Sequence, residues 1–192
     1  MEYVQPIRDK KQIENMKRYL KESNIRDWLL FVLGINSGLR ISDLLKLTVE
    51  DVNGKERISI KETKTGKTKD FPLSDNCKKA IIEYLKSLKL TAGVLFPSRK
   101  SSGSGNTGAI SRQQAYDVIN KAAMQVGIIT KTNGINIGTH TLRKTFGYHA
   151  YQSGISIEVI QKLLNHSAPS VTLRYLGITQ DELDNVYINL NL

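Results

Sequence analysis

The longest apolar stretch of this chain is WLLFVLGI, residues 28–35, which lies between Asn24 and Gly38. A helix built from it is apolar on all sides, as a helix at the centre of a core should be. Asn24 can cap its first turn, and Gly38 can end it in the left-handed conformation that glycine adopts without strain. The next charged side chain is Arg40. We therefore expect Arg40 to be held beside the core.

Further segments have apolar residues at helical spacing or begin with a residue that can cap a first turn. We expect helices over residues 9–22, from Ser42 through Leu47, from Ser74 to about Leu88, from Ser111 to Gly127, from Thr139 or Thr141 to about Ser153, and from Ser156 to Leu164. Ser170 is expected to begin a short turn that carries Tyr175.

Two short segments instead alternate apolar and polar residues, which is typical of strands. They are residues 57–62 and 71–73, and Thr65-Gly66 lies between them. This pattern predicts a β-hairpin with Lys64 at its tip. The fold class is therefore α+β, a mainly helical domain with a small antiparallel β-sheet. We expect one domain over residues 1–192 and interpret the glycine- and serine-rich segment 98–108 as a loop within it.

The charge balance points to a polyanionic partner. The chain has 28 Lys and Arg against 18 Asp and Glu, a net charge of +10. The excess gathers in the centre, and Asp117 is the one acidic residue between residues 101 and 150. Basic surfaces bind nucleic acid by displacing counterions from phosphates, although many basic proteins are only well solvated.

Several classes of protein are disfavoured by composition. The longest apolar stretch is far shorter than the ~20 residues that cross a bilayer, and the first residues do not resemble a signal peptide. Cys77 is the only cysteine, so an internal disulfide and a cysteine-based zinc site are excluded. We expect a cytoplasmic protein with no membrane partner.

His140 and Arg143 form the first chemical pair. Three positions on a helix turn a side chain by about 60°, so both residues face the same way and can share one ligand. Nine positions separate His149 from His140, which places His149 on the opposite face. We interpret His149 as structural.

Five motifs in order resemble the signature of the tyrosine recombinases, the family of the phage integrases and Cre. They are Gly38-Leu39-Arg40-Ile41-Ser42-Asp43-Leu44, Thr63-Lys64-Thr65-Gly66, His140-Thr141-Leu142-Arg143, Leu164-Asn165-His166-Ser167 and Arg174-Tyr175. Each motif alone is weak, but their joint occurrence over residues 10–178 is specific. The resemblance implies a DNA recombinase whose catalytic positions are Arg40, Lys64, His140, Arg143, His166 and Tyr175.

Elementary chemistry explains three of these residues. Attack on a phosphodiester gathers negative charge on two non-bridging oxygens, and the guanidinium groups of Arg40 and Arg143 can clamp them. The Tyr175 hydroxyl can be the nucleophile and form a 3′-phosphotyrosine, which preserves the energy of the broken bond. This chemistry needs no ATP, metal or other cofactor.

The remaining three residues can move protons or bind phosphate. His140 can be the general base that accepts the tyrosine proton, and His166 can donate a hydrogen bond to a phosphate oxygen. Lys64 can be the general acid that protonates the departing 5′-oxygen, carried in by a mobile hairpin.

Each assignment has a simpler alternative when it is considered alone. Arg40 can pair with Asp43 at i+3. Lys67 or Lys69 can replace Lys64 as the general acid, or Lys64 can be a solvated turn residue. His166 can be a partly buried structural histidine, and Tyr175 competes with seven other tyrosines among the eight in the chain.

The resemblance also has departures and open points. Lys144 follows Arg143 where histidine is common in the family, and Asn165 precedes His166 where glycine is common. Family members usually carry a separate helical core-binding domain, and we expect none before this catalytic sequence. The chain is then either a fragment or a short stand-alone integrase.

The resemblance further implies partners. These are double-stranded DNA, further copies of the chain in a synaptic tetramer on DNA, and accessory DNA-bending factors. The segment 176–192 resembles the tail that docks on a neighbouring protomer, and a helix folded onto its own domain is an equal alternative. Two other functions stay open: DNA relaxation like that of a type IB topoisomerase, and DNA binding without cleavage.

Overall fold

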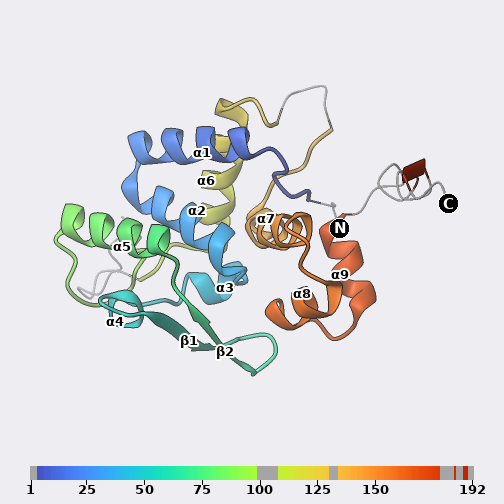
Figure 1. The fold of residues 1–192 in the computed structure, drawn as a ribbon. Helices are drawn as coiled ribbons and strands as arrows, with labels where there is room; N and C mark the ends of the chain where they lie inside the picture. Colours follow the sequence, from blue (N-terminus) through green and yellow to red (C-terminus); the bar gives the residue numbers. More distant parts are fainter. Residues whose placement is uncertain (1–3, 99–107, 130–133, 178–183, 185–187, 190–192) are drawn as a thin grey trace.

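A computed structural model describes residues 4–98, 108–129, 134–177, 184 and 188–189. Its helices are α1 (Lys10–Ser23), α2 (Ile25–Ser37), α3 (Ile41–Leu44), α4 (Val49–Val52), α5 (Asp75–Leu88), α6 (Arg112–Gln125), α7 (Thr139–Gln152), α8 (Ile157–Leu163) and α9 (Pro169–Leu176). The antiparallel strands β1 (Arg57–Lys61) and β2 (Thr68–Pro72) form a two-stranded sheet (Figure 1). The α+β class with a small hairpin is confirmed.

Helix α2 occupies the centre of the core, as its apolar sequence predicts. It packs against α1, α5, α6 and α7, and its Leu29, Leu30 and Phe31 are fully buried. The Asn24 side chain caps its start by accepting from the Arg26 amide, and Gly38 ends it with φ +59°. Both end residues are those expected from the sequence.

Helix α7 lies very close to α2. A Cβ on Gly34 of α2 would stand 2.5 Å from Leu142 Cδ1 of α7, so a larger residue here would force Leu142 to shift. The close crossing brings the segment after α2, which contains Arg40, next to the helix that carries His140 and Arg143.

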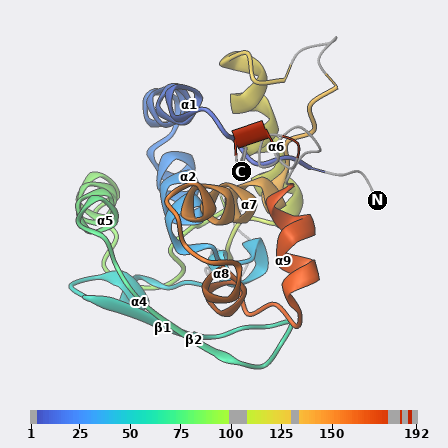
Figure 2. The same cartoon turned by 45° about the vertical axis from the view of Figure 1, so that its right-hand side comes forward.

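A second apolar cluster attaches α8 and α9 to α7. Ile160, Leu164 and Leu176 are buried in it, and Phe146 of α7 and Tyr175 pack against them. This cluster places the last two helices beside one end of α7, where they face the hairpin tip (Figures 1 and 2).

The hairpin turns at Thr65-Gly66 as predicted, but its second strand is Thr68–Pro72 and not residues 71–73. Ile58 pairs with Phe71, and the turn between the strands contains Gly66 at φ +66°. The Glu62 amide donates to Lys67 O, and the Gly66 amide donates to Glu62 O. These bonds close the turn that carries Lys64.

Three local expectations were wrong. Helix α3 starts at Ile41, because the Arg40 carbonyl accepts its first hydrogen bonds, so Ser42 lies inside the helix and does not cap it. Helix α7 is preceded by Gly138, whose amide donates to the Thr141 side chain. Tyr175 lies on a helix of 8 residues and not on a turn. Pro169 favours that helix, because a first-turn residue needs no amide donor.

Two predicted segments lie largely outside the described residues. They are residues 99–107 of the expected loop and most of the tail after Gly177. The loop ends meet, since Pro97 pairs with Ala109 in a β-bridge. Over the described ranges, no helix has the length and apolar character needed to cross a membrane.

Candidate active site

All six residues singled out in the sequence line one pocket. The pocket has a volume of about 280 Å³ and is lined by Arg40, Lys64, Thr65, His140, Arg143, Asn165, His166, Ser167, Val171 and Tyr175. These residues come from the segment after α2, the hairpin turn, α7, the α8–α9 connection and α9. The fold therefore gathers residues that are up to 135 positions apart in the sequence, from Arg40 to Tyr175.

Arg143 is the most buried member, with 2% of its surface exposed. Its Nη1 donates to Gly38 O at 2.7 Å, and its Nη2 donates to Leu164 O. These carbonyls lie at the C-terminal ends of α2 and α8, where helix dipoles favour a cation. Two helix ends therefore hold this guanidinium in place.

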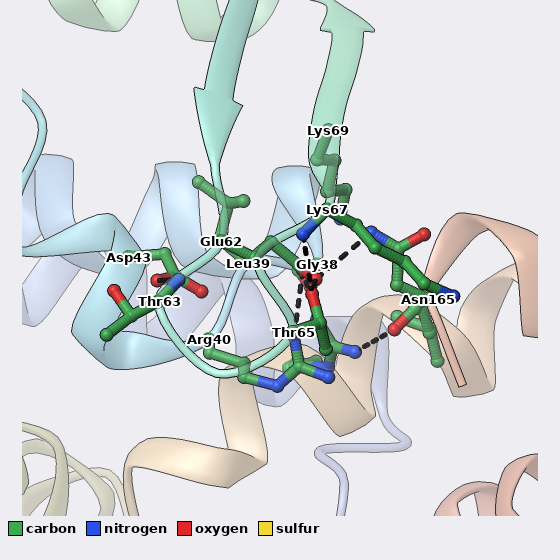
Figure 3. Close-up of polar contacts among 12 residues, drawn as sticks. Gly38, Leu39, Arg40, Asp43, Glu62, Thr63, Thr65, Lys67, Lys69 and Asn165 are labelled. Carbon is green, nitrogen blue, oxygen red and sulfur yellow. Dashed lines mark hydrogen bonds and ion pairs between the residues drawn. The ribbon is translucent and has the colours of Figure 1, made fainter. Parts of the chain in front are cut away.

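Arg40 pairs with a residue that the sequence analysis did not assign. Its Nη1 lies 2.8 Å from Glu62 Oε1, while Asp43 Oδ1 accepts from the Thr63 amide (Figure 3). The alternative Arg40–Asp43 pair is thus wrong, because Asp43 is used to anchor the hairpin backbone. Arg40 Nη1 is itself buried against this carboxylate, and the Arg40 side chain also lines the pocket.

His140 and Tyr175 lie next to each other. His140 Nδ1 is 3.4 Å from the Tyr175 hydroxyl oxygen. Burial raises the pKa of Tyr175 above its ordinary value, although Arg143 and Arg40 act in the opposite direction. Desolvation and then the charge of Arg143 lower the pKa of His140 below that of a free imidazole. At neutral pH a protonated tyrosine therefore faces a neutral histidine, the pair that general-base catalysis requires.

His166 is held on the other side of the tyrosine. Its Nδ1 lies 3.0 Å from the buried Thr172 hydroxyl, and its ring packs edge-on against the Tyr175 ring with centroids 4.9 Å apart. Desolvation, followed by the charges of Arg143 and Arg40, lowers the pKa of His166 to about 4. His166 is therefore neutral at pH 7, and the ring nitrogen that does not face Thr172 can donate a hydrogen bond to a ligand in the pocket.

The three candidate lysines have different environments. Lys64 is exposed and lines the pocket. Lys69 is buried and donates to Ser37 O at 2.9 Å, and desolvation lowers its pKa to about 8. Lys67 is exposed and does not line the pocket. Of the three, the fold brings Lys64 to the other site residues.

Glu62 is the functional candidate that sequence reasoning missed. Its carboxylate is completely buried between the hairpin and the two arginines. The only sign of Glu62 in the sequence is an acidic residue two positions before Lys64, and the sequence does not show that this residue is buried. His149 lies outside the pocket. Its Nε2 is 3.0 Å from Ile7 O, as expected for a histidine with a structural role.

Metal binding gains no support from the side chains that are described. Among them, no group of three or more His, Cys, Asp or Glu residues is arranged to hold an ion. Arg40, Lys64 and Arg143 line the pocket and bring positive charge to it.

Comparisons with known proteins found a matching family model and several relatives. The model of the phage integrase family matches residues 8–182. The probable integrase/recombinase YoeC of Bacillus subtilis (strain 168) is 44% identical over 187 residues, which are 97% of each chain. Three matched Xer tyrosine recombinases are longer. This chain spans 53% of XerA of Pyrococcus horikoshii, 53% of XerC of Thermodesulfovibrio yellowstonii and 52% of XerD of Corynebacterium glutamicum.

Solved structures share the fold. The crystal structure of XerA recombinase matches with a TM-score of 0.78 at 19% identity, over 100% of this chain and 67% of that one. XerH site-specific recombinase bound to its difH substrate, in a post-cleavage complex, matches with a TM-score of 0.70 at 18% identity, over 96% and 53%.

Proposed function

Because this chain belongs to the phage integrase family of tyrosine recombinases, we propose that it is a site-specific recombinase that cleaves and rejoins DNA through Tyr175. The observation that carries the proposal is the pocket in which Tyr175 meets two arginines, two histidines and Lys64. These residues can bind a phosphate, supply a nucleophile and move two protons.

Phosphate binding falls to Arg40 and Arg143. A guanidinium has five donors. Two carbonyls occupy part of the donors of Arg143, and Glu62 lies against Nη1 of Arg40, so each guanidinium keeps further donors while both residues line the pocket. Both groups can therefore donate to the non-bridging oxygens as negative charge develops there. Fixed donors of this kind stabilise a transition state without reorganising.

Cleavage then follows a balanced exchange of bonds. The Tyr175 oxygen attacks phosphorus while its proton passes to His140, and a 3′-phosphotyrosine forms. The bond to the 5′-oxygen breaks, and Lys64 donates a proton to that oxygen. His166 donates a hydrogen bond to a phosphate oxygen. The reverse sequence with a 5′-hydroxyl from a second site completes strand transfer.

The nucleophile is tested with a nicked suicide substrate, which traps the covalent adduct. Tyr175→Phe should bind DNA like the parent and form no adduct, because only the attacking oxygen is lost. Tyr151→Phe is the control, since Tyr151 packs in the same apolar cluster but does not line the pocket. An adduct in Tyr175→Phe would move the nucleophile to another residue. This assay also separates a protein that cleaves DNA from one that only binds it.

The general acid is tested by changing the leaving group. Lys64→Ala should slow cleavage by roughly 10²–10⁴-fold, the usual contribution of a general acid. A substrate with sulfur in place of the 5′-oxygen releases a thiolate, whose conjugate acid has a pKa of about 8.5 and needs little help from a proton donor. The variant should regain most of its rate on that substrate.

The other two hairpin lysines serve as controls. Lys67→Ala should cleave at the parent rate, because Lys67 lies outside the pocket. Lys69→Ala should lose stability, because Ser37 O loses its buried donor. A sulfur rescue that is confined to Lys67→Ala or Lys69→Ala would assign the acid to that lysine.

Assembly on DNA is part of the same proposal. Strand exchange needs two DNA sites, so we expect several copies of the chain to assemble on DNA. Accessory DNA-bending factors are expected as further partners. We expect the protein to act in the cytoplasm, at the nucleoid. Removing residues 178–192 should spare cleavage and impair strand exchange if that tail docks on a neighbouring copy. Equal loss of both activities would favour a tail that stabilises its own domain.

A further inference from the structure

Glu62 is an unusual residue for a phosphate-binding pocket. Its side chain has no exposed surface, and its carboxylate lies against the guanidinium groups that should bind DNA. A buried carboxylate costs free energy unless it is paired, and it repels a phosphate. Phosphate binding therefore does not explain why a carboxylate is buried at this position.

The two carboxylate oxygens have different partners. Oε1 lies 2.8 Å from Arg40 Nη1 and 3.8 Å from Arg143 Nη1. Oε2 accepts hydrogen bonds from Thr65 Oγ1 at 2.7 Å and from Asn165 Nδ2 at 3.0 Å (Figure 3). Burial alone would raise the pKa of Glu62, but the bonds from Thr65 and Asn165 and the charge of Arg40 lower it below its ordinary value. Glu62 is therefore ionised at neutral pH.

The bonds to Oε2 connect the hairpin tip to the body of the protein. Glu62 and Thr65 flank Lys64 in the turn, so their hydrogen bond fixes the local shape of the tip. Asn165 belongs to the connection between α8 and α9 and precedes His166. The hairpin projects from the core, and its tip reaches this connection (Figures 1 and 2). The Glu62–Asn165 bond thus joins the turn that carries Lys64 to the segment that carries His166.

The backbone of Asn165 suits this contact. Its φ is +47°, in the left-handed region that glycine adopts more easily than any other residue. A glycine at this position would relieve strain but could not donate to Glu62. The strained asparagine is consistent with a need for its side-chain amide.

We propose that Glu62 is a positioning residue which, through its hydrogen bond to Asn165, holds the hairpin tip so that Lys64 can reach the leaving oxygen. Glu62 does not touch DNA in this arrangement, and its pairing with Arg40 compensates its charge. The inference rests on the proposed function, because it concerns the lysine that acts as general acid.

Asn165→Gly is the variant that tests the link, because glycine accepts the same φ and removes only the side chain. It should slow cleavage of an ordinary phosphodiester by about 10-fold or more, but by less than Lys64→Ala. DNA affinity should be unchanged. Cleavage of the 5′-sulfur substrate should return to the parent rate, and Asn165→Gly should cause no further loss when Lys64 is already alanine. Asn165→Asp, which keeps the shape but repels Glu62, should lose at least as much.

Lys89→Gly is the matched control. Lys89 and Asn165 are the two non-glycine residues with positive φ in the described part of the chain, and Lys89 lies outside the pocket. Lys89→Gly should cleave both substrates like the parent. The proposal is overturned if Asn165→Gly cleaves at the parent rate, if its loss persists on the sulfur substrate, or if its loss multiplies with that of Lys64→Ala.

Hydrogen exchange of the hairpin separates this inference from the proposed function. The amides of Glu62 and Gly66, which are bonded across the turn, should exchange faster in Asn165→Gly than in the parent and in Lys89→Gly. If the parent protein forms no covalent adduct with DNA but hydrogen exchange is still faster in Asn165→Gly, the Glu62–Asn165 link exists and the proposed function is wrong. If exchange is unchanged, the positioning role is wrong whatever the parent's activity.

Discussion

Gly38→Ala should destabilise the protein more than an alanine at any open left-handed glycine. Gly38 has φ +59°, and a Cβ there would stand 2.6 Å from Phe146 Cδ1 and 3.2 Å from Leu164 Cδ2. The left-handed conformation costs a non-glycine residue about 1–2 kcal/mol. Overpacking a core adds about 1–3 kcal/mol. We therefore expect the free energy of unfolding to fall by roughly 2–5 kcal/mol.

Gly54→Ala isolates the steric part of this loss. Gly54 has φ +68°, but nothing lies within 4 Å of the Cβ that it would gain. Gly54→Ala should lower the free energy of unfolding only by the conformational cost, about 1–2 kcal/mol. The measurement is urea unfolding of both variants and the parent, with m values checked for equality. Equal losses in the two variants would refute the packing argument.

Gly38→Ala should also affect the active site. The Gly38 carbonyl accepts from Arg143 Nη1 at 2.7 Å, so a shift of Gly38 moves a guanidinium that binds the phosphate. Cleavage by the folded fraction should fall in Gly38→Ala and not in Gly54→Ala. The adduct assay at a temperature where both variants are folded measures this difference.

Other expectations concern solution conditions. Cleavage should be complete in EDTA without nucleotide, because Arg40, Arg143 and Lys64 supply the positive charge; activity that returns only with magnesium would contradict this. DNA affinity should fall about 10³-fold between 50 and 200 mM salt if about six phosphates are contacted, and a flat response would remove the electrostatic argument. The pKa of His140 is lowered by desolvation and then by Arg143, so the second-order rate of adduct formation should stay level down to about pH 6.5 and fall only at lower pH. The pKa of His166 is about 4 in the folded protein and about 6.5 in the unfolded chain, so stability should be lost as the pH falls from 6.5 towards 4, and less so in His166→Gln.

Local features of the fold could be predicted because their causes lie within a few residues. Asn24 and Ser74 cap the helices that follow them, and Gly38 and Gly66 adopt the left-handed conformations expected of them. The predicted start of α3 and the predicted turn around Tyr175 were wrong, although both predictions also rested on local sequence. Around Tyr175 the decision comes from packing, because α9 lies against α7 and α8 in the second apolar cluster.

The candidate site divides in the same way. The six candidate residues could be named from the sequence, because the motifs occur in the family's order and each role requires a side chain of a particular chemical type. Only the tertiary structure decided that Arg40 pairs with Glu62 and not with Asp43, and that Lys69 is buried while Lys64 lines the pocket. It also revealed the bond between Glu62 and Asn165, which are 103 positions apart. Capping and periodicity act over a turn or two of chain, whereas the burial of a charge depends on which distant segments pack around it.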